Sequence, residues 1–240
     1  CAVVNVVESS IARDADLVLP IYCGQEIGVA STKAFIGQML VLYILSIKIS
    51  YDQNFISKKV YQSKINNLLS LSNSARKTLK LDHKLLNIGK VFAHAKGSMF
   101  LGRGYSFPIA LEGALKLKEL AYVHAEGYPA GEMKHGPLAL IEEGMPVVVI
   151  APRDLHYKKT MSNMQEVIAR GAKVLLITNK SKDEIISENI WEQIEVDNLD
   201  EELTPFLTTI PLQKLAFYAA LEKGYDIDKP RNLAKSVTVE

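Results

Sequence analysis

The sequence predicts an α/β fold built on parallel β-sheets. Short β-rich runs alternate with helical stretches of roughly ten to twenty residues, first over residues 1–50 and again, at full length, from about residue 85. Strands separated by helices in this way form parallel βαβ units with right-handed crossovers. Gly102 and Gly104 of the run GRG also follow an expected strand and precede an expected helix, although any tight turn favours glycine.

The first unit of this kind lies in residues 1–50. We expect strands at CAVVNV (1–6) and LVLPIY (17–22), with a short capped helix, ESSIARDAD, between them. The run 24–50 then opens with small and polar residues and continues as a long apolar helix. Residues 51–84 carry leucine and isoleucine at helical spacing, so we expect a connecting helical segment there.

From residue 85 the alternation repeats with longer elements. The expected strands are 97–104, 146–152, 173–179 and 190–196, and the expected helices are 106–126, 157–171 and 203–224. In parallel sheets, ligands bind at the carboxyl ends of the strands, in the loops that lead into helices.

The composition is that of an ordinary soluble globular protein, with 48% hydrophobic and 23% charged residues. A formal net charge of +1 gives no electrostatic case for nucleic acid or an anionic membrane surface as a partner. The longest apolar run, residues 39–50, is interrupted by a serine and a lysine, so we expect a buried helix rather than a membrane span. Cys1 and Cys23 form no CxxC or Cys/His cluster, which fits a reducing compartment and gives no support for a zinc site.

The sequence contains no GxGxxG, Walker A or GxSxG stretch, so dinucleotide, ATP and serine-hydrolase chemistry have no support. Ser31 and Thr32 lie near the start of a long helix, where unpaired N–H groups and the helix dipole suit an anion or a sugar oxygen. Routine capping of that helix is the alternative.

A row of charged residues lies on the expected helix 106–126. Glu112, Lys116 and Glu119 are spaced four and three residues apart and therefore share one face, whereas Lys118 points elsewhere. The rest of this helix is rich in leucine and alanine, and such a helix is largely buried. Burial and neighbouring charge shift pKa values toward neutrality, as acid–base catalysis requires. A solvent-facing ladder of ion pairs is the alternative.

His135 is the best candidate for proton transfer near neutral pH. It lies in the segment 124–140, where glycines and prolines exclude a continuous helix and predict irregular backbone. His124 is expected inside the preceding helix, as a packed or capping residue. Lys235, near the end of the chain, could act as a nucleophile toward a carbonyl. A structural loop histidine and a frayed terminus are the alternatives.

Five stretches carry a family resemblance. They are GVASTKAF (28–35), LGRG (101–104), ALEGALKLKE (110–119), AGEMKHGPLALI (130–141) and PRNLAKSVTVE (230–240). Together, and in this order, they resemble the isomerase half of the glucosamine-6-phosphate synthases, also called glutamine–fructose-6-phosphate aminotransferases (isomerizing). That half consists of two sugar isomerase (SIS) domains with three αβα layers. The resemblance implies that residues 1–50 end a first SIS domain, 51–84 connect, and 85–240 form a second SIS domain with a catalytic tail.

The resemblance also implies a reaction, in which fructose 6-phosphate and ammonia give glucosamine 6-phosphate at the start of hexosamine and UDP-GlcNAc biosynthesis. Lys235 would form a Schiff base with C2 of the open-chain sugar. His135, contributed by the neighbouring subunit of a homodimer, would assist ring opening and closing. Glu119 would move a proton between C1 and C2, and Lys116 would assist at the C1 oxygen.

Further expectations follow from the same resemblance. Sugar contacts are implied for Val29, Ala30, Ser31 and Ala234, with no cofactor and no metal, in a cytoplasmic enzyme. The sequence departs from the family because it has no glutaminase domain and no SQSGET-like phosphate loop, and because Cys1 opens a strand and is not the glutaminase nucleophile. We therefore expect the chain to be the later part of a longer enzyme, with ammonia supplied by a domain that the chain lacks.

Two alternatives stay open at this point. One is a glucosamine-6-phosphate deaminase or a sugar-phosphate isomerase with two SIS domains. The other is a non-catalytic SIS module that senses sugar phosphates, which has no need of Lys116, Glu119, His135 and Lys235 together.

Overall fold

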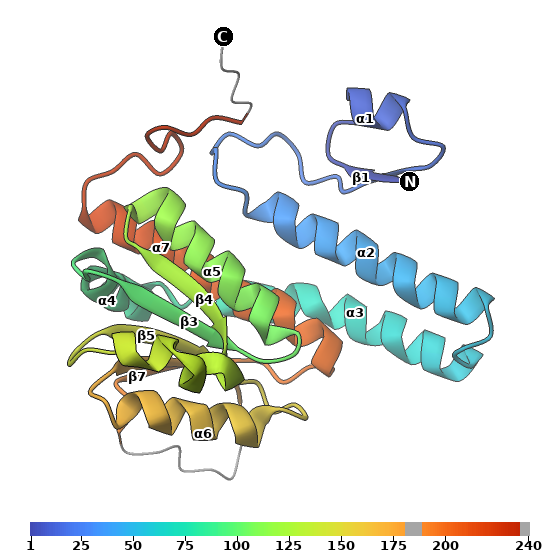
Figure 1. The fold of residues 1–240 in the computed structure, drawn as a ribbon. Coiled ribbons are helices and arrows are strands. Elements are labelled where there is room, and N and C mark those ends of the chain that lie inside the picture. The colour runs from blue at the N-terminus through green and yellow to red at the C-terminus, as the bar shows by residue number, and fades with distance from the viewer. Residues whose placement is uncertain (181–188, 236–240) are drawn as a thin grey trace. The chain divides into compact units, whose positions relative to one another are not determined.

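The computed structural model describes residues 1–180 and 189–235 (Figure 1). The end of the terminal motif, residues 236–240, lies outside the described residues. The chain divides into two compact units. The first unit comprises Cys1–Ser70 together with the tail from Arg231, and the second unit comprises Leu71–Pro230.

The second unit is built on a five-stranded sheet with the strand order β4-β3-β5-β6-β7, in which all neighbouring strands are parallel. The strands are β3 (Ser98–Gly102), β4 (Ala125–Pro129), β5 (Pro146–Ile150), β6 (Lys173–Asn179) and β7 (Glu192–Val196). The strands β3 and β5 are buried along their whole length. The predicted parallel sheet is therefore confirmed, with β4 as a strand that the sequence pattern did not predict.

Helices cover both faces of this sheet (Figure 1). They are α4 (Asp82–Ala93), α5 (Ser106–Ala121), α6 (Tyr157–Ile168) and α7 (Thr204–Glu222). Met99 and Leu101 of β3 share a core cluster with Met164 of α6. Phe100, between them in the strand, points to the opposite face and meets Phe92 of α4, with ring centroids 6.3 Å apart. Alternate residues of one strand thus fill two cores, which confirms the three αβα layers.

The turn from β3 into α5 depends on glycine. A Cβ atom on Gly102 would lie 2.3 Å from the carbonyl oxygen of Ser106, a distance that no side chain tolerates. Gly104 has φ +52°, in the left-handed region that glycine adopts at little cost. The two glycines therefore let the strand pass directly into the helix that carries the predicted row of charges.

Helix α5 ends at Ala121 rather than at residue 126, so the prediction that His124 lies inside this helix is wrong. Tyr122 has φ +54°, and a left-handed residue cannot continue a right-handed helix. The chain then enters β4, whose backbone pairs with β3. His124 is exposed just before that strand, with its Nε2 3.4 Å from Glu126 Oε1.

The first unit contains a parallel pair of short strands, β1 (Ala2–Val4) and β2 (Val18–Pro20), in the register Ala2 opposite Val18. The predicted capped helix lies between them as α1 (Ser10–Arg13), and the Ser9 hydroxyl accepts a hydrogen bond from the N–H of Ala12. The long apolar helix is α2 (Lys33–Asp52), and α3 (Lys58–Thr78) supplies the helical segment predicted between residues 51 and 84.

The prediction that the apolar run 39–50 forms a buried helix is wrong. Only Ala34 and Ile47 of α2 are buried, and Leu42 is 53% exposed. The first unit offers this 20-residue helix a sheet of just two strands, which covers little of its surface. By length and composition alone α2 could cross a membrane, but one such helix is weak evidence, because core helices of soluble proteins pass the same test.

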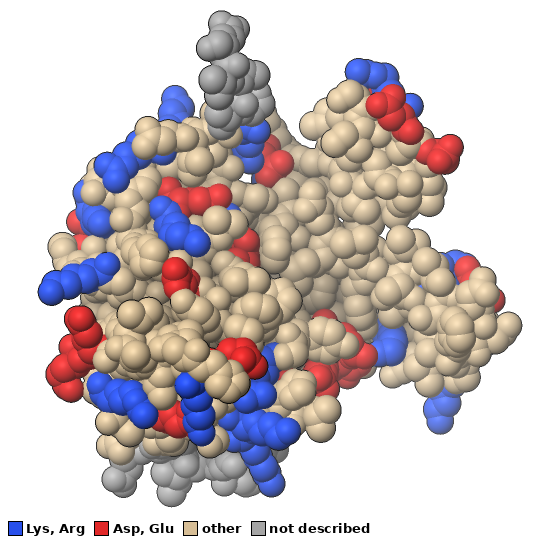
Figure 2. All heavy atoms as spheres, viewed as in Figure 1, with Lys and Arg blue, Asp and Glu red and all other residues tan. Residues whose placement is uncertain are grey.

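Charged side chains of both signs are interspersed over the visible face of the second unit rather than gathered into one patch (Figure 2). This distribution accords with the net charge of +1. It offers no stripe of positive charge of the kind that binds nucleic acid on this face.

Candidate active site

The row of charge on α5 is buried, which excludes the alternative of a solvent-facing ladder. The side chain of Lys116 is 2% exposed, and its Nζ pairs with Glu119 Oε2 and lies 3.6 Å from Glu112 Oε1. The side chain of Glu112 is 9% exposed and that of Glu119 23% exposed. Helix α5 packs against α7, β3 and β4, and this packing removes the row from water. Lys118, predicted to point away from this face, is exposed.

The two carboxylates of the row differ in environment. Burial raises the pKa of Glu112, and the nearby Lys116 ammonium opposes this shift only in part. Among the described residues, Glu112 Oε1 has no hydrogen-bond partner. Two carboxyl groups therefore share one buried ammonium, and Glu119 is the carboxylate with access to solvent. Such an array can move protons at a substrate bound beside Glu119 while Lys116 stabilises negative charge.

His135 ends the 3-10 helix η1 (Ala130–His135), which β4 precedes and the 3-10 helix η2 (Pro137–Leu140) follows. The segment 124–140 thus contains no α-helix, as predicted, but it is more regular than predicted. Met133 is fully buried, and Lys134 Nζ lies 2.9 Å from Glu166 Oε1 of α6, so η1 is anchored on the second unit. The His135 ring faces outward and is 72% exposed.

Glu132 is a functional candidate that the sequence reasoning missed. Its Oε2 lies 2.8 Å from His135 Nδ1, three residues along the same 3-10 helix. A carboxylate at Nδ1 orients an imidazole and leaves Nε2 available for proton transfer. The spacing of three residues is the signal that could have indicated this pair.

The first unit has a cavity of about 690 Å³ beside the carboxyl ends of β1 and β2, where ligands of parallel sheets bind. It is lined by Asn5, Val6, Val7, Glu8, Tyr22, Gly24, Gln25, Glu26 and Lys235. Lys235 Nζ lies 3.3 Å from Glu26 Oε1, a contact between residues 209 positions apart. Glu26 was missed by the sequence reasoning, because no local pattern marks such a distant partner.

The predicted sugar-contact residues lie close in sequence to Glu26 or to Lys235. Val29, Ala30 and Ser31 are half-buried in the segment that leads into α2, and Ala234 is exposed beside Lys235. Thr32 is the N-cap residue of α2 and makes no side-chain capping hydrogen bond, so its hydroxyl does not cap the helix in the routine way. Three pairs of candidate residues are thus in contact. The pairs Lys116–Glu119 and His135–Glu132 lie in the second unit. The pair Lys235–Glu26 lies in the first unit.

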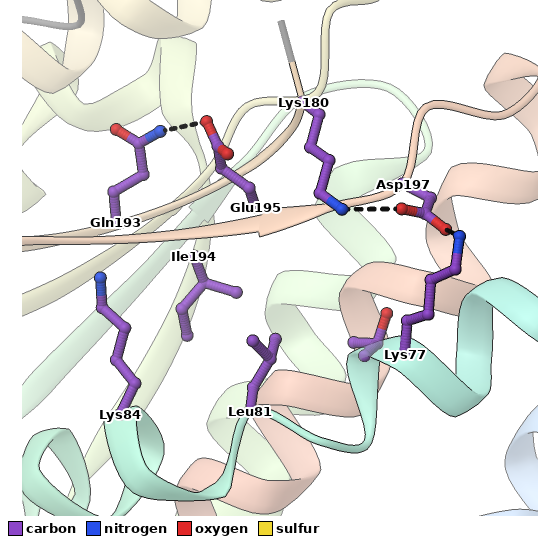
Figure 3. Close-up of a pocket in the computed structure, with 9 residues that line it drawn as sticks. Lys77, Leu81, Lys84, Lys180, Gln193, Ile194, Glu195 and Asp197 are labelled. Atoms are coloured by element: carbon purple, nitrogen blue, oxygen red, sulfur yellow. Dashed lines mark hydrogen bonds and ion pairs between the residues drawn. The ribbon is translucent and has the colours of Figure 1, made fainter.

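A second cavity, of about 480 Å³, lies on the second unit beside β7 (Figure 3). Asp197 there accepts hydrogen bonds from Lys77 and Lys180, each at 2.9 Å. The hydrogen bond from Lys77, with that from Lys180, lowers the pKa of Asp197 to about 2. Lys84 of the same cavity pairs with Glu192. Because these lysines are already paired, the cluster fastens α3 and α4 to β7, and we assign it a structural role.

Residues 1–180 and 189–235 contain no group of three or more His, Cys, Asp or Glu side chains that could hold a metal ion.

Comparison with known proteins identifies related chains. One match is glutamine–fructose-6-phosphate aminotransferase [isomerizing] of Bacteroides thetaiotaomicron, 50% identical over 98% of this chain and 38% of the relative. The protein of the same name from Bartonella henselae is 47% identical over 99% of this chain and 39% of the relative. The chain thus spans about two fifths of the length of these curated relatives.

Solved structures agree with this similarity. The C-terminal domain of glucosamine-fructose-6-phosphate aminotransferase from Francisella tularensis superposes with a TM-score of 0.90 at 42% identity, covering 94% of this chain and 63% of that one. A glucosamine-6-phosphate deaminase from Thermotoga maritima gives a TM-score of 0.74 at 25% identity, covering 99% of this chain and 66% of that one.

A family model described as "SIS domain" matches residues 91–223, more than half of the chain. The matched range contains the whole five-stranded sheet, the charged row of α5 and the His135 segment. The resemblance inferred from the five motifs is confirmed by these relatives. The chain belongs to the SIS domain family.

Proposed function

We propose that this chain is the isomerase portion of a glutamine–fructose-6-phosphate aminotransferase and converts fructose 6-phosphate and ammonia to glucosamine 6-phosphate. The observation that carries the proposal is the buried Glu112–Lys116–Glu119 row, which places a carboxylate with partial access to solvent beside a desolvated ammonium. It occurs in a chain that is 47% to 50% identical, over nearly its whole length, to relatives that carry this name.

The first stage of the proposed reaction is imine formation. His135, whose ring carries a carboxylate at Nδ1, opens the sugar ring by proton transfer through Nε2. The Lys235 amine then attacks the C2 carbonyl, and loss of water gives a Schiff base. Ammonia displaces the lysine, so that C2 carries the imine of fructose 6-phosphate and Lys235 returns to its starting state.

The second stage is isomerisation. Glu119 removes a proton from C1 and returns a proton to C2, while the C1 hydroxyl loses its proton and becomes the aldehyde oxygen. The nitrogen on C2 takes up the proton that the hydroxyl loses, so that the imine becomes the amine of the product. Lys116 stabilises the charge that develops on the C1 oxygen during this transfer. The product is glucosamine 6-phosphate, the expected entry compound for hexosamine and UDP-GlcNAc biosynthesis. The half-buried Val29, Ala30 and Ser31, with the backbone at Ala234, are proposed to contact the sugar.

We propose the assembly that the family resemblance of the motifs implies. Residues 1–50 would be the C-terminal part of one SIS domain, 51–84 a connector, and 85–240 a second SIS domain with a catalytic tail. This division is supported by the parallel β1–β2 pair and by the complete sheet of the second unit. Ammonia would come from a glutaminase domain outside these 240 residues, and His135 would serve the active site of the other subunit in a homodimer. We place the enzyme in the cytoplasm.

A deaminase is the second candidate, favoured by the fold match to the Thermotoga maritima enzyme. The test is an assay of the complete protein with fructose 6-phosphate and either glutamine or an ammonium salt, with glucosamine 6-phosphate detected by mass spectrometry. We expect product with both nitrogen donors. Release of ammonia from glucosamine 6-phosphate, with no synthesis from glutamine, would instead establish a deaminase. Binding of the sugar phosphate without turnover would support a sensing module.

A further inference from the structure

In the first unit, the proposed nucleophile Lys235 contacts Glu26, a residue to which the proposed mechanism gives no role. Lys235 Nζ lies 3.3 Å from Glu26 Oε1, with the lysine side chain 41% and the glutamate side chain 24% exposed. Both residues line the cavity of about 690 Å³ at the carboxyl ends of β1 and β2. Pockets of a few hundred to about a thousand Å³ take ligands of the size of a sugar phosphate.

The structure holds Glu26 in place from both sides. The Asn5 side chain donates to the carbonyl of Gly24 at 2.7 Å and accepts from the N–H of Cys23 at 3.2 Å, which ties the loop before Glu26 to the end of β1. Lys33 Nζ donates to the carbonyl of Gln25 at 2.6 Å. The carboxylate that meets Lys235 is therefore carried by a loop with fixed neighbours rather than by a free surface segment.

We propose that Glu26 is a catalytic residue that carries the proton of Lys235 during Schiff-base formation. The inference rests on the proposed function, because it assumes that Lys235 attacks the sugar carbonyl. A lysine that forms an imine must first lose a proton, and an acceptor within hydrogen-bond reach of its nitrogen makes that loss part of the reaction. Glu26 meets this geometric requirement, because its Oε1 lies 3.3 Å from Lys235 Nζ.

The Lys235 ammonium gives a proton to the Glu26 carboxylate, and the neutral amine attacks C2 of the open-chain ketose. The former carbonyl oxygen takes up the proton that the attacking nitrogen loses, which gives a carbinolamine. Glu26 then returns its proton to the departing hydroxyl, and water leaves as the protonated imine forms. Glu26 ends the step as a carboxylate, so no other acid or base is consumed.

The lining of the cavity narrows the choice of proton carrier. Asn5 and Gln25 have amide side chains, which do not accept protons near neutral pH. The carboxylates in the described lining are Glu8 and Glu26, and of these two Glu26 is the one ion-paired to Lys235.

The test is borohydride trapping of fructose 6-phosphate on the complete protein, with the rate of labelling at Lys235 followed by peptide mass spectrometry. Glu26→Gln keeps the size and a hydrogen-bond acceptor for the lysine but cannot carry the proton. We expect it to slow labelling by about 100-fold, the usual scale of general acid–base catalysis. The sugar concentration that gives half-maximal labelling should stay the same.

The controls separate proton transfer from a structural effect. Glu26→Asp retains a carboxylate and should recover labelling in part, whereas Asp52→Asn, at an exposed position at the end of α2 and outside the lining of this cavity, should label at the wild-type rate. If wild-type protein labels at Lys235 and Glu26→Gln labels equally fast, Glu26 carries no proton and this inference alone fails. If the wild-type protein shows no label at Lys235, the proposed Schiff base itself is wrong, and the role of Glu26 falls with it.

Discussion

Replacing Lys116 by methionine removes the charge that the two carboxylates of α5 share. The Lys116 side chain is 2% exposed, and its partners Glu112 and Glu119 are 9% and 23% exposed. Methionine fills most of the space of the lysine stem, so overpacking or cavity costs stay below about 1.5 kcal/mol. The substitution therefore tests mainly the electrostatics of the row.

The stability that Lys116→Met should lose follows from the burial of its ion pairs with Glu112 and Glu119. Removing one partner of a buried ion pair costs about 3 to 5 kcal/mol, because the remaining charge is uncompensated. We expect the lower end, about 3 kcal/mol near neutral pH, because Glu119 is partly exposed and can be hydrated. At roughly 2 to 4 °C per kcal/mol for a chain of this size, the melting temperature should fall by about 6 to 12 °C.

The stability lost in Lys116→Met should become smaller as the pH falls. Burial already raises the pKa of Glu112 above its usual value, and removing the Lys116 ammonium takes away the interaction that opposes this rise. A group whose pKa is higher in the folded state favours folding at low pH and loses that contribution as the pH rises. The variant should therefore approach the stability of the parent chain as acidification protonates Glu112.

The assay is urea unfolding at several pH values, followed by the fluorescence of Trp191, the single tryptophan of the chain. Lys118→Met, on the exposed side of the same helix, is the matched control and should change the free energy of unfolding by less than about 0.5 kcal/mol. Equal stabilities for the two variants near neutral pH would refute the reasoning, as would a loss that grows on acidification.

Two further predictions concern carboxylates outside the α5 row. The pKa of Asp197 is about 2 in the folded chain, below the ordinary 3.8, so its pairs with Lys77 and Lys180 stabilise the fold above about pH 4 and cease to do so as the pH falls toward 2. Since both lysines are more than half exposed, Asp197→Asn should cost about 1 kcal/mol at neutral pH. At pH 2, where the carboxyl is about half protonated, urea unfolding should show a cost less than half as large, and an equal cost at both pH values would contradict this expectation. Glu132→Ala should lower the kcat for amination of fructose 6-phosphate about tenfold by freeing the His135 ring, and an unchanged kcat would show that the contact is incidental.

The parts of the fold that depend on local pattern could be predicted from the sequence. Apolar runs separated by helical stretches located β3, β5 and β6, and the spacing of Glu112, Lys116 and Glu119 placed them on one face of α5. The pattern could not predict where α5 ends, because the left-handed backbone of Tyr122 follows from the entry of β4 into the sheet rather than from residue type.

Features that depend on distant partners could not be predicted. Hydrophobicity predicted a buried α2, but burial requires elements that cover a helix, and the first unit supplies two short strands. Glu26 and Lys235 are 209 positions apart, so no periodicity relates them. Which carboxylate of the α5 row keeps access to solvent depends on how tightly neighbouring elements pack against the helix. At Gly113, for example, an added Cβ would lie 2.9 Å from both Leu212 of α7 and Phe100 of β3.

The central claim is that the accessible glutamate on the buried helix moves the proton between the first two carbons of the sugar. The most direct measurement is deuterium incorporation into glucosamine 6-phosphate formed in heavy water, with the complete protein and its Glu119→Gln variant. We expect that the variant still forms the trapped imine at Lys235 but neither exchanges the C1 proton nor releases the aldose. Isomerised, deuterated product from the variant at the parent rate would contradict it.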